Sequence, residues 1–281
     1  INDDERRLVR FLRDMHPAIL VPILTHLAES VDRSAAAKWA DWLVGMEEDP
    51  YMDTFPEAFR ARWLMCLCSL DLLDQARALY RRWTGASGSP LEPKVRAAYQ
   101  SRHTSMNFSG NAVYRQIHHA FGSQAPHESA EVVHPATDNI IHRNGACMLA
   151  LVRKFGHGTQ WKSAPDTQFA RAVRDDFLVH VYGSHMPPSH YELTALLQAC
   201  MLLREHQVAM RVLRTMESFG YELDAKDMAV LLGGMMDVNP SAAVMIMKHL
   251  SAPLSRNPHL YAAVLSRCVS SSHFELADQV Y

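Results

Sequence analysis

Apolar residues along the chain recur mainly with the spacing of an amphipathic helix. They occupy positions i, i+3, i+4 and i+7 in five segments: 35–46, 73–83, 191–203, 207–219 and 242–250. The alternation typical of strands is nearly absent, and glycine and proline lie mainly between the apolar segments, where they end helices. The pattern predicts an all-α protein built from many short helices.

The helical segments recur as two-helix units. Tyr191–Asp224 is followed by a second copy, Lys226–Pro258, and by a third that begins at His259; an earlier copy covers Ala58–Leu91. An apolar pair marks the first helix of the copies: Trp63/Leu64, Leu196/Leu197, Leu231/Leu232 and Val264/Leu265. A small residue marks the second helix: Ala76, Ala209, Ala243 and Ala277. The match of Ala243 requires one residue fewer in the preceding loop.

These copies divide the chain into four parts. We expect an N-terminal helical region with a degenerate repeat (1–56), two basic repeats (57–136), a degenerate repeat with an insertion (137–189), and three repeats (190–281). The last copy stops at Tyr281, midway through its second helix, so we expect the array to continue. Stacking such units buries a continuous core that no single unit forms alone.

Gly220 and Asp224 lie between the expected helix over residues 207–219 and the helix expected after Asp224. Glycine adopts a left-handed conformation without a Cβ clash, so Gly220 is expected to close the first helix. Asp224 precedes the next helix and is expected to cap its free N–H groups. Neither role requires a ligand.

The copy Tyr191–Asp224 resembles the pentatricopeptide repeat. The apolar pair, Ala209 and the spacing of Met216, Gly220 and Asp224 fall at that motif's positions, and the step from Tyr191 to Lys226 is 35 residues. The tetratricopeptide repeat, with 34 residues and a different first helix, is the alternative. The resemblance implies a right-handed α-solenoid of antiparallel two-helix repeats.

In the family that the chain resembles, each repeat reads one base of single-stranded RNA with two side chains. The resemblance places this role on Thr194 and Asp224, a pair that favours guanine, with Tyr191 near the position that stacks on a base. The corresponding pairs, Ala229/Pro258 and Ala61/Leu91, offer no hydrogen bond to a base edge, so at most one repeat is expected to read a base. Further candidate RNA-binding residues are Lys94, Arg96, Arg102 and Lys226.

Charge is unevenly distributed although the net charge is only −2. Residues 29–57 contain eight acidic and two basic residues, whereas residues 60–115 contain nine basic and three acidic residues. The basic segment is a candidate path for phosphates. The alternative is a solvated helical face, where arginine is ordinarily found.

Signals for catalysis, metal binding and membrane insertion are weak. The 16 histidines show no metal-binding spacing, and no phosphate-binding loop or nucleophile elbow occurs, so we predict no metal site, no cofactor and no enzymatic activity. The adjacent acids Asp175 and Asp176 are expected at the surface. The five cysteines lie in apolar segments and are expected to be buried thiols. The longest apolar run, 18–24, is too short to span a membrane.

Together the repeats and the resemblance predict a non-enzymatic protein of mitochondrial RNA metabolism, RNA processing or translation. Its partners would be single-stranded RNA or ribosomal RNA and the other proteins of a mitochondrial ribonucleoprotein, such as the mitochondrial ribosome. The mitochondrial location is implied by the resemblance alone. The alternative is a helical-repeat scaffold that binds proteins and makes no contact with RNA.

Overall fold

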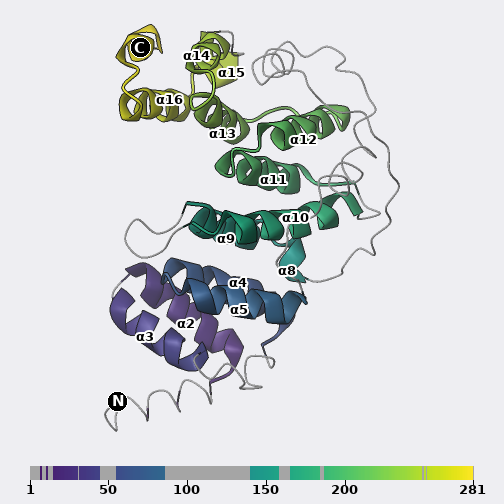
Figure 1. Ribbon diagram of the computed structural model, residues 1–281, viewed down its shortest axis with the longest axis vertical. Coiled ribbons are helices and arrows are strands. Elements are labelled where there is room, and N and C mark those ends of the chain that lie inside the picture. The colour runs from purple at the N-terminus through teal and green to yellow at the C-terminus, as the bar shows by residue number, and fades with distance from the viewer. Residues whose placement is uncertain are drawn as a thin grey trace. The chain divides into compact units, whose positions relative to one another are not determined.

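The computed structural model describes residues 7, 11, 15–30, 32–44, 55–85, 140–157, 165–183, 187–248, 250 and 252–280. These residues form helices and short connections, without a strand among them, so the predicted all-α class is confirmed (Figure 1). In this part of the chain, no helix combines the length and the apolar character that crossing a bilayer requires. The candidates Lys94, Arg96 and Arg102 lie outside the described residues.

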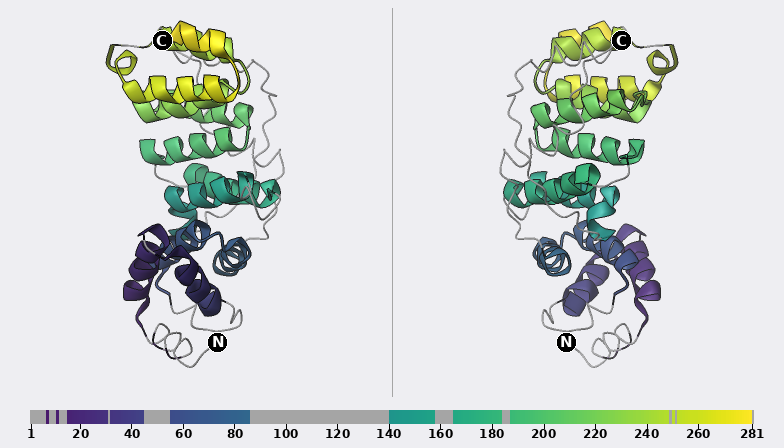
Figure 2. Two further views of the ribbon diagram at one scale, coloured as in Figure 1. Left: turned by 90° about the vertical axis from the view of Figure 1, so that its left-hand side faces the viewer. Right: turned by 90° about the vertical axis from the view of Figure 1, so that its right-hand side faces the viewer.

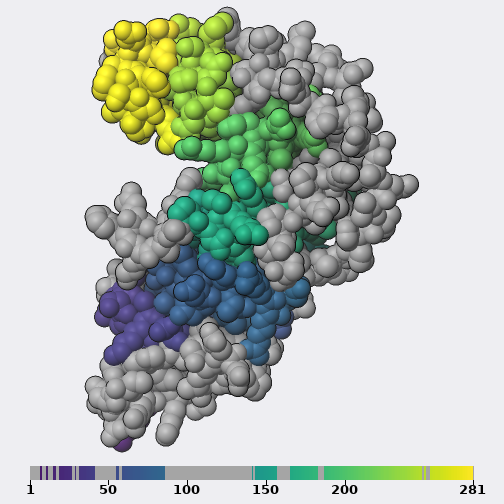
Figure 3. Space-filling model, in the orientation of Figure 1, coloured from purple at the N-terminus to yellow at the C-terminus, as the bar shows by residue number. Residues whose placement is uncertain are grey.

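The chain forms two compact units. The first comprises residues 1–90 and 137–180 and the second residues 91–136 and 181–281, so the division falls within α10. The described helices of the first unit are α2 (Pro17–Ser30), α3 (Arg33–Val44), α4 (Glu57–Ser69), α5 (Leu73–Thr84), α8 (Ile140–Arg143), α9 (Gly145–His157) and most of α10 (Thr167–Gly183). Helix α4 packs against α2, α5, α8 and α9. In Figure 3 the side chains of α4 and α5, in blue, form one continuous surface.

Aromatic residues fill much of the core of the first unit. Trp63 of α4 is fully buried, and its ring lies edge-on to Phe55 with the centroids 5.6 Å apart. The ring centroid of Phe169 of α10 lies 4.6 Å from that of Phe155 of α9 and 5.6 Å from that of Tyr80 of α5. Burying such rings accounts for a large part of core stability.

The second unit contains the aligned repeats of the C-terminal region. Its described helices are α11 (His190–Leu202), α12 (His206–Ser218), α13 (Ala225–Met235), α14 (Pro240–Lys248), α15 (Ala252–Ser255), α16 (Pro258–Ser270) and α17 (Phe274–Val280). The first helices of the copies contact one another in order, α11 with α13 and α13 with α16. Figure 2 shows these helices, in green to yellow, side by side in both views.

Three of the copies share one connection between their two helices. In each, the middle residue of a three-residue connection is left-handed: Asp71 (φ 61°), Arg204 (φ 57°) and Ser272 (φ 59°). The next residue then donates its backbone N–H to the first helix, in the bonds Leu72 to Leu67, Glu205 to Cys200 and His273 to Cys268. Cys268 therefore takes the place of Cys200, as the alignment predicts.

The connection between α13 and α14 differs. No left-handed residue occurs in it, and the backbone N–H of Asn239 bonds to the carbonyl of Met235 at 2.7 Å. Helix α12 begins ten residues after Leu196, whereas α14 begins nine residues after Leu231. Helix α14 therefore begins one residue early, as the alignment requires. The expected shorter loop was wrong, however, because the connection 236–239 is one residue longer than the three-residue connections and the missing residue falls within α13.

Most of the small and apolar marker positions are buried as expected, whereas Leu265 and Ala277 of the last copy are half-buried. Ala76, Ala209 and Ala243 are fully buried, and so are both leucine pairs of the second unit. Gly220 ends α12 in the left-handed conformation, with φ at +72°, which confirms its predicted role. All five cysteines are free and buried, and burial raises the pKa of the Cys66 thiol to about 11 and that of Cys68 to about 12.

The expectation that Asp175 and Asp176 lie at the surface was wrong. Asp175 is buried and pairs with the Nε atom of Arg174, also buried, at 2.8 Å. The Tyr80 hydroxyl of α5 donates to Oδ2 of Asp176 at 2.7 Å. Burial raises the pKa of Asp176 to about 6. Burial also raises the pKa of Tyr80, above its ordinary value of 10. The acidic pair lies on the inner face of α10, where hydrogen-bond and ion-pair partners offset the cost of burying it.

Candidate functional site

The N-terminal ends of α11 and α13 are both closed by capping boxes. Asp224 accepts hydrogen bonds from the backbone N–H groups of Lys226 and Asp227, both at 2.8 Å. Asp227 in turn accepts from the backbone N–H of Asp224 at 3.1 Å. The Asp-x-x-Asp spacing produces this reciprocal pair, as Ser189 and Glu192 do at the start of α11. The predicted capping role of Asp224 is confirmed.

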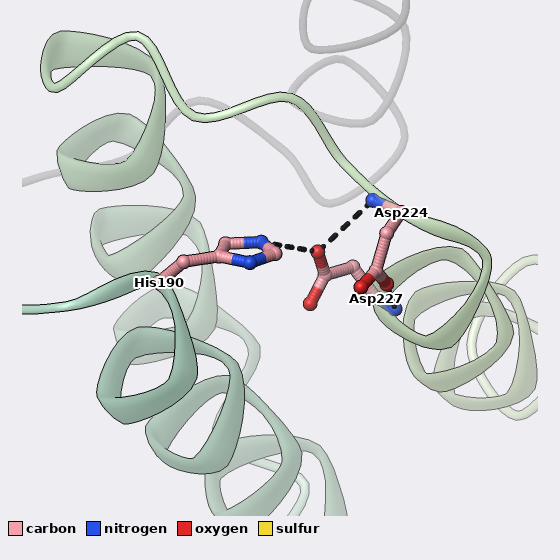
Figure 4. A group of neighbouring side chains, drawn as sticks. All are labelled: His190, Asp224 and Asp227. Atoms are coloured by element: carbon pink, nitrogen blue, oxygen red, sulfur yellow. Dashed lines mark hydrogen bonds and ion pairs between the residues drawn. The ribbon is translucent and has the colours of Figure 1, made fainter.

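Asp227 connects the two helices from a fully buried position. Its Oδ1 accepts the hydroxyl proton of Thr194 at 2.7 Å, and its Oδ2 lies 2.9 Å from Nε2 of His190. Figure 4 shows His190 reaching from α11 toward Asp227, with Asp224 beside it. Because a buried carboxylate is costly without donors, these contacts fix α11 against α13. Sequence analysis did not single out Asp227 or His190, although the capping-box spacing marks Asp227.

The structure places Thr194 and Asp224 in different surroundings. Thr194 is only 4% exposed, and its hydroxyl proton is committed to Asp227. Asp224 is exposed, with its cap bonds made through Oδ1. The two residues are therefore linked through Asp227, and of the two it is the carboxylate of Asp224 that faces solvent.

Tyr191 in the first turn of α11 and Lys226 in the first turn of α13 lie close together on the exposed side of these helices. The Tyr191 side chain is 54% exposed, and Nζ of Lys226 lies 6.0 Å from the centre of its ring. Nearby, the Tyr221 ring lies 5.4 Å from that of His190 and 6.2 Å from that of Phe219. We call this surface the α11–α13 edge, defined by His190, Tyr191, Phe219, Tyr221, Asp224 and Lys226.

The α11–α13 edge combines three kinds of recognition chemistry. Its aromatic faces can stack on a planar group, and its ammonium group can pair with an anion. Its exposed carboxylate accepts hydrogen bonds from N–H donors. No covalent or proton-transfer step is required for any of these contacts.

The equivalent positions of the other copies lack this combination. Ala229 lies on α13 and Ala61, which is buried, on α4; neither side chain can hydrogen-bond. Pro258 is the first residue of α16, and the cap there is Asn257, whose side chain accepts from the backbone N–H of His259 at 2.9 Å. Leu91 lies outside the described residues.

No protein-family model matches the chain, and neither a curated protein nor a solved structure matches it. The likeness to the pentatricopeptide repeat therefore rests on the residues and spacings of the chain itself.

Proposed function

We propose that the chain is a right-handed α-solenoid of antiparallel, pentatricopeptide-like repeats that binds single-stranded RNA at the α11–α13 edge and catalyses no reaction. The left-handed connections at Asp71, Arg204 and Ser272 support the repeats, because the same three-residue turn falls at the same alignment position in all three copies. The ordered contacts of α11, α13 and α16 support the stacking.

The observation that carries the RNA proposal is the exposed Tyr191 ring of α11 with Lys226 above it. Asp224 lies beside Lys226 at the start of α13. Proteins that bind single strands combine aromatic stacking platforms with cations that follow the phosphate backbone. Stacking on an aromatic side chain contributes roughly 1–3 kcal/mol per base. The edge thus supplies one base platform and one phosphate contact.

The base at this platform is guanine in our proposal. A carboxylate can accept hydrogen bonds from both N1–H and N2–H of guanine, and the exposed Asp224 offers such a carboxylate. Thr194 acts as a positioning residue: its bond to Asp227 holds the first turn of α13, and this turn carries Asp224. The other aligned copies contact only the phosphate backbone of the RNA or do not contact the RNA.

In the cell, the proposed role is in mitochondrial RNA metabolism, RNA processing or translation. The partners would be single-stranded or ribosomal RNA and the proteins of a mitochondrial ribonucleoprotein, including the mitochondrial ribosome. This part of the proposal comes from the family resemblance.

A protein–protein scaffold is the second candidate. Large apolar side chains are exposed on the C-terminal helices, with Met245 of α14 and Phe274 of α17 each 61% exposed and Val269 of α16 59% exposed. Exposed apolar side chains of this size are common at protein interfaces.

Equilibrium binding to short, unstructured U-rich RNAs that differ at one central position tests the RNA proposal. Wild type should prefer guanine at that position by roughly tenfold, a typical value for one good bidentate contact. Asp224→Asn keeps the helix cap and should lose the preference. Asp278→Asn, on the exposed surface of α17, is the matched control and should retain it.

Binding should also weaken as salt is raised, because phosphate contacts release counterions. Absence of binding to all four RNAs at low salt would contradict the RNA proposal and favour the scaffold.

A further inference from the structure

We propose that His190, Asp224 and Asp227 form a binding site for a divalent transition-metal ion of the Zn²⁺ class. Each residue offers one ligand atom, and these atoms all lie within 4.8 Å of one another (Figure 4). The three side chains come from the starts of α11 and α13. The site shares Asp224 with the proposed guanine contact, so the two ligands would compete for it, but metal binding itself does not require RNA.

The donor set matches this class of ion. One imidazole nitrogen and two carboxylate oxygens suit Zn²⁺ and its first-row neighbours better than Ca²⁺ or Mg²⁺, which prefer oxygen alone. Two carboxylates also bring two negative charges, which a dication neutralises. Capping of α13 uses Oδ1 of Asp224 for both backbone bonds, so it does not use Oδ2.

Surrounding residues hold two of the ligands in place. The Thr194 hydroxyl donates to Oδ1 of Asp227, which directs Oδ2 toward His190. The ring of Tyr221 lies 5.4 Å from the imidazole of His190, and the Tyr221 hydroxyl is itself fixed by the carbonyl of Pro188 at 2.9 Å. Such supporting contacts orient metal ligands and tune their affinity.

The geometry requires only small side-chain adjustments. Ligand atoms about 2.0–2.2 Å from a tetrahedral ion stand about 3.3–3.6 Å apart. His190 Nε2 and Asp227 Oδ2, now 2.9 Å apart, would separate slightly, and Asp224 would close in. On binding, the ion replaces the hydrogen bond between these two atoms, and the imidazole coordinates in its neutral form with Nε2 deprotonated. Water completes the fourth position.

Calorimetric titration of the full chain with ZnCl₂ alone at neutral pH tests the site. The double variant His190→Gln/Asp224→Asn removes two ligands while Asn preserves the cap of α13. Its matched control is His259→Gln/Asp278→Asn, which makes the same chemical changes at exposed residues of α16 and α17. Circular dichroism verifies that both variants are folded.

Wild type and the control should bind Zn²⁺ with equal affinity at their tightest site. The double variant should bind at least about tenfold more weakly, because loss of even a supporting contact lowers metal affinity 10–100-fold. Co²⁺ should give visible absorption bands that the double variant lacks. Equal affinity of the double variant and wild type, or no Zn²⁺ binding by wild type, would overturn the proposal. Because the metal is the only probe, neither result depends on RNA.

Discussion

The Thr194 hydroxyl donates a 2.7 Å hydrogen bond to Asp227, 33 residues further along the chain and on a different helix. Both residues are buried, and they belong to the first helices of two consecutive aligned copies. A buried bond between neighbouring copies contributes to the interface energy that stabilises a stack of repeats. The same carboxylate also contacts His190, so one side chain sets the geometry of the α11–α13 edge.

Thr194→Val should destabilise the protein by about 1–3 kcal/mol, because it leaves a buried carboxylate with one donor fewer. Urea unfolding followed by circular dichroism measures the change. The control Thr167→Val replaces an exposed threonine of α10 and should stay within about 0.5 kcal/mol of wild type. Equal unfolding midpoints for Thr194→Val and wild type would show that the bond contributes nothing.

Ala209→Leu should destabilise the protein by about 1–3 kcal/mol, because Ala209 is fully buried where α11 and α12 pack together. Thermal unfolding reports the change as a lower midpoint. Ala262→Leu, at an exposed position of α16, adds the same atoms without overpacking and should leave the midpoint nearly unchanged. A stable Ala209→Leu protein would count against the repeat alignment at this position.

Asp176→Asn should change how stability depends on pH. Burial raises the pKa of Asp176 to about 6, above its value of about 3.9 in an unfolded chain. The folded state thus keeps a proton that the unfolded state has lost, so the stability from this group is full below about pH 4 and falls as the pH rises to about 6. The uncharged amide introduced by the substitution has no such titration.

Urea unfolding between pH 4 and pH 7 therefore should show Asp176→Asn gaining roughly 1–3 kcal/mol relative to wild type as the pH rises. Most of the gain should occur below about pH 6. Asp278→Asn, at an exposed carboxylate, should show no comparable gain. A constant difference between Asp176→Asn and wild type across this range would mean that Asp176 does not titrate there.

Features that depend on local sequence were predictable. The turn at Gly220, the cap at Asp224 and the buried Ala209 follow from backbone conformation and helical spacing, and all three are confirmed. The missing residue before α14 was also predictable, because aligned helices must begin at matching places.

Contacts between distant helices were not predictable. The partner of Asp176 is Tyr80, 96 residues earlier, and nothing in the local pattern around Asp176 indicates which face of α10 meets α5. His190 and Asp227 are 37 residues apart, so no motif of fixed short spacing brings them together. Thr194 was assigned to an RNA contact by resemblance, and its bond to Asp227 emerged only from the packing of α11 on α13.

The most direct test of RNA binding at the α11–α13 edge compares the affinities of Tyr191→Ala, Phe274→Ala and wild type for the same guanine-containing, single-stranded RNA. Both variants remove an exposed aromatic ring of the second unit, 54% exposed at Tyr191 and 61% at Phe274. Tyr191→Ala should weaken binding by roughly 5- to 150-fold, the loss of one stacked base, and Phe274→Ala should bind like wild type. Wild-type affinity in Tyr191→Ala would contradict the proposed site.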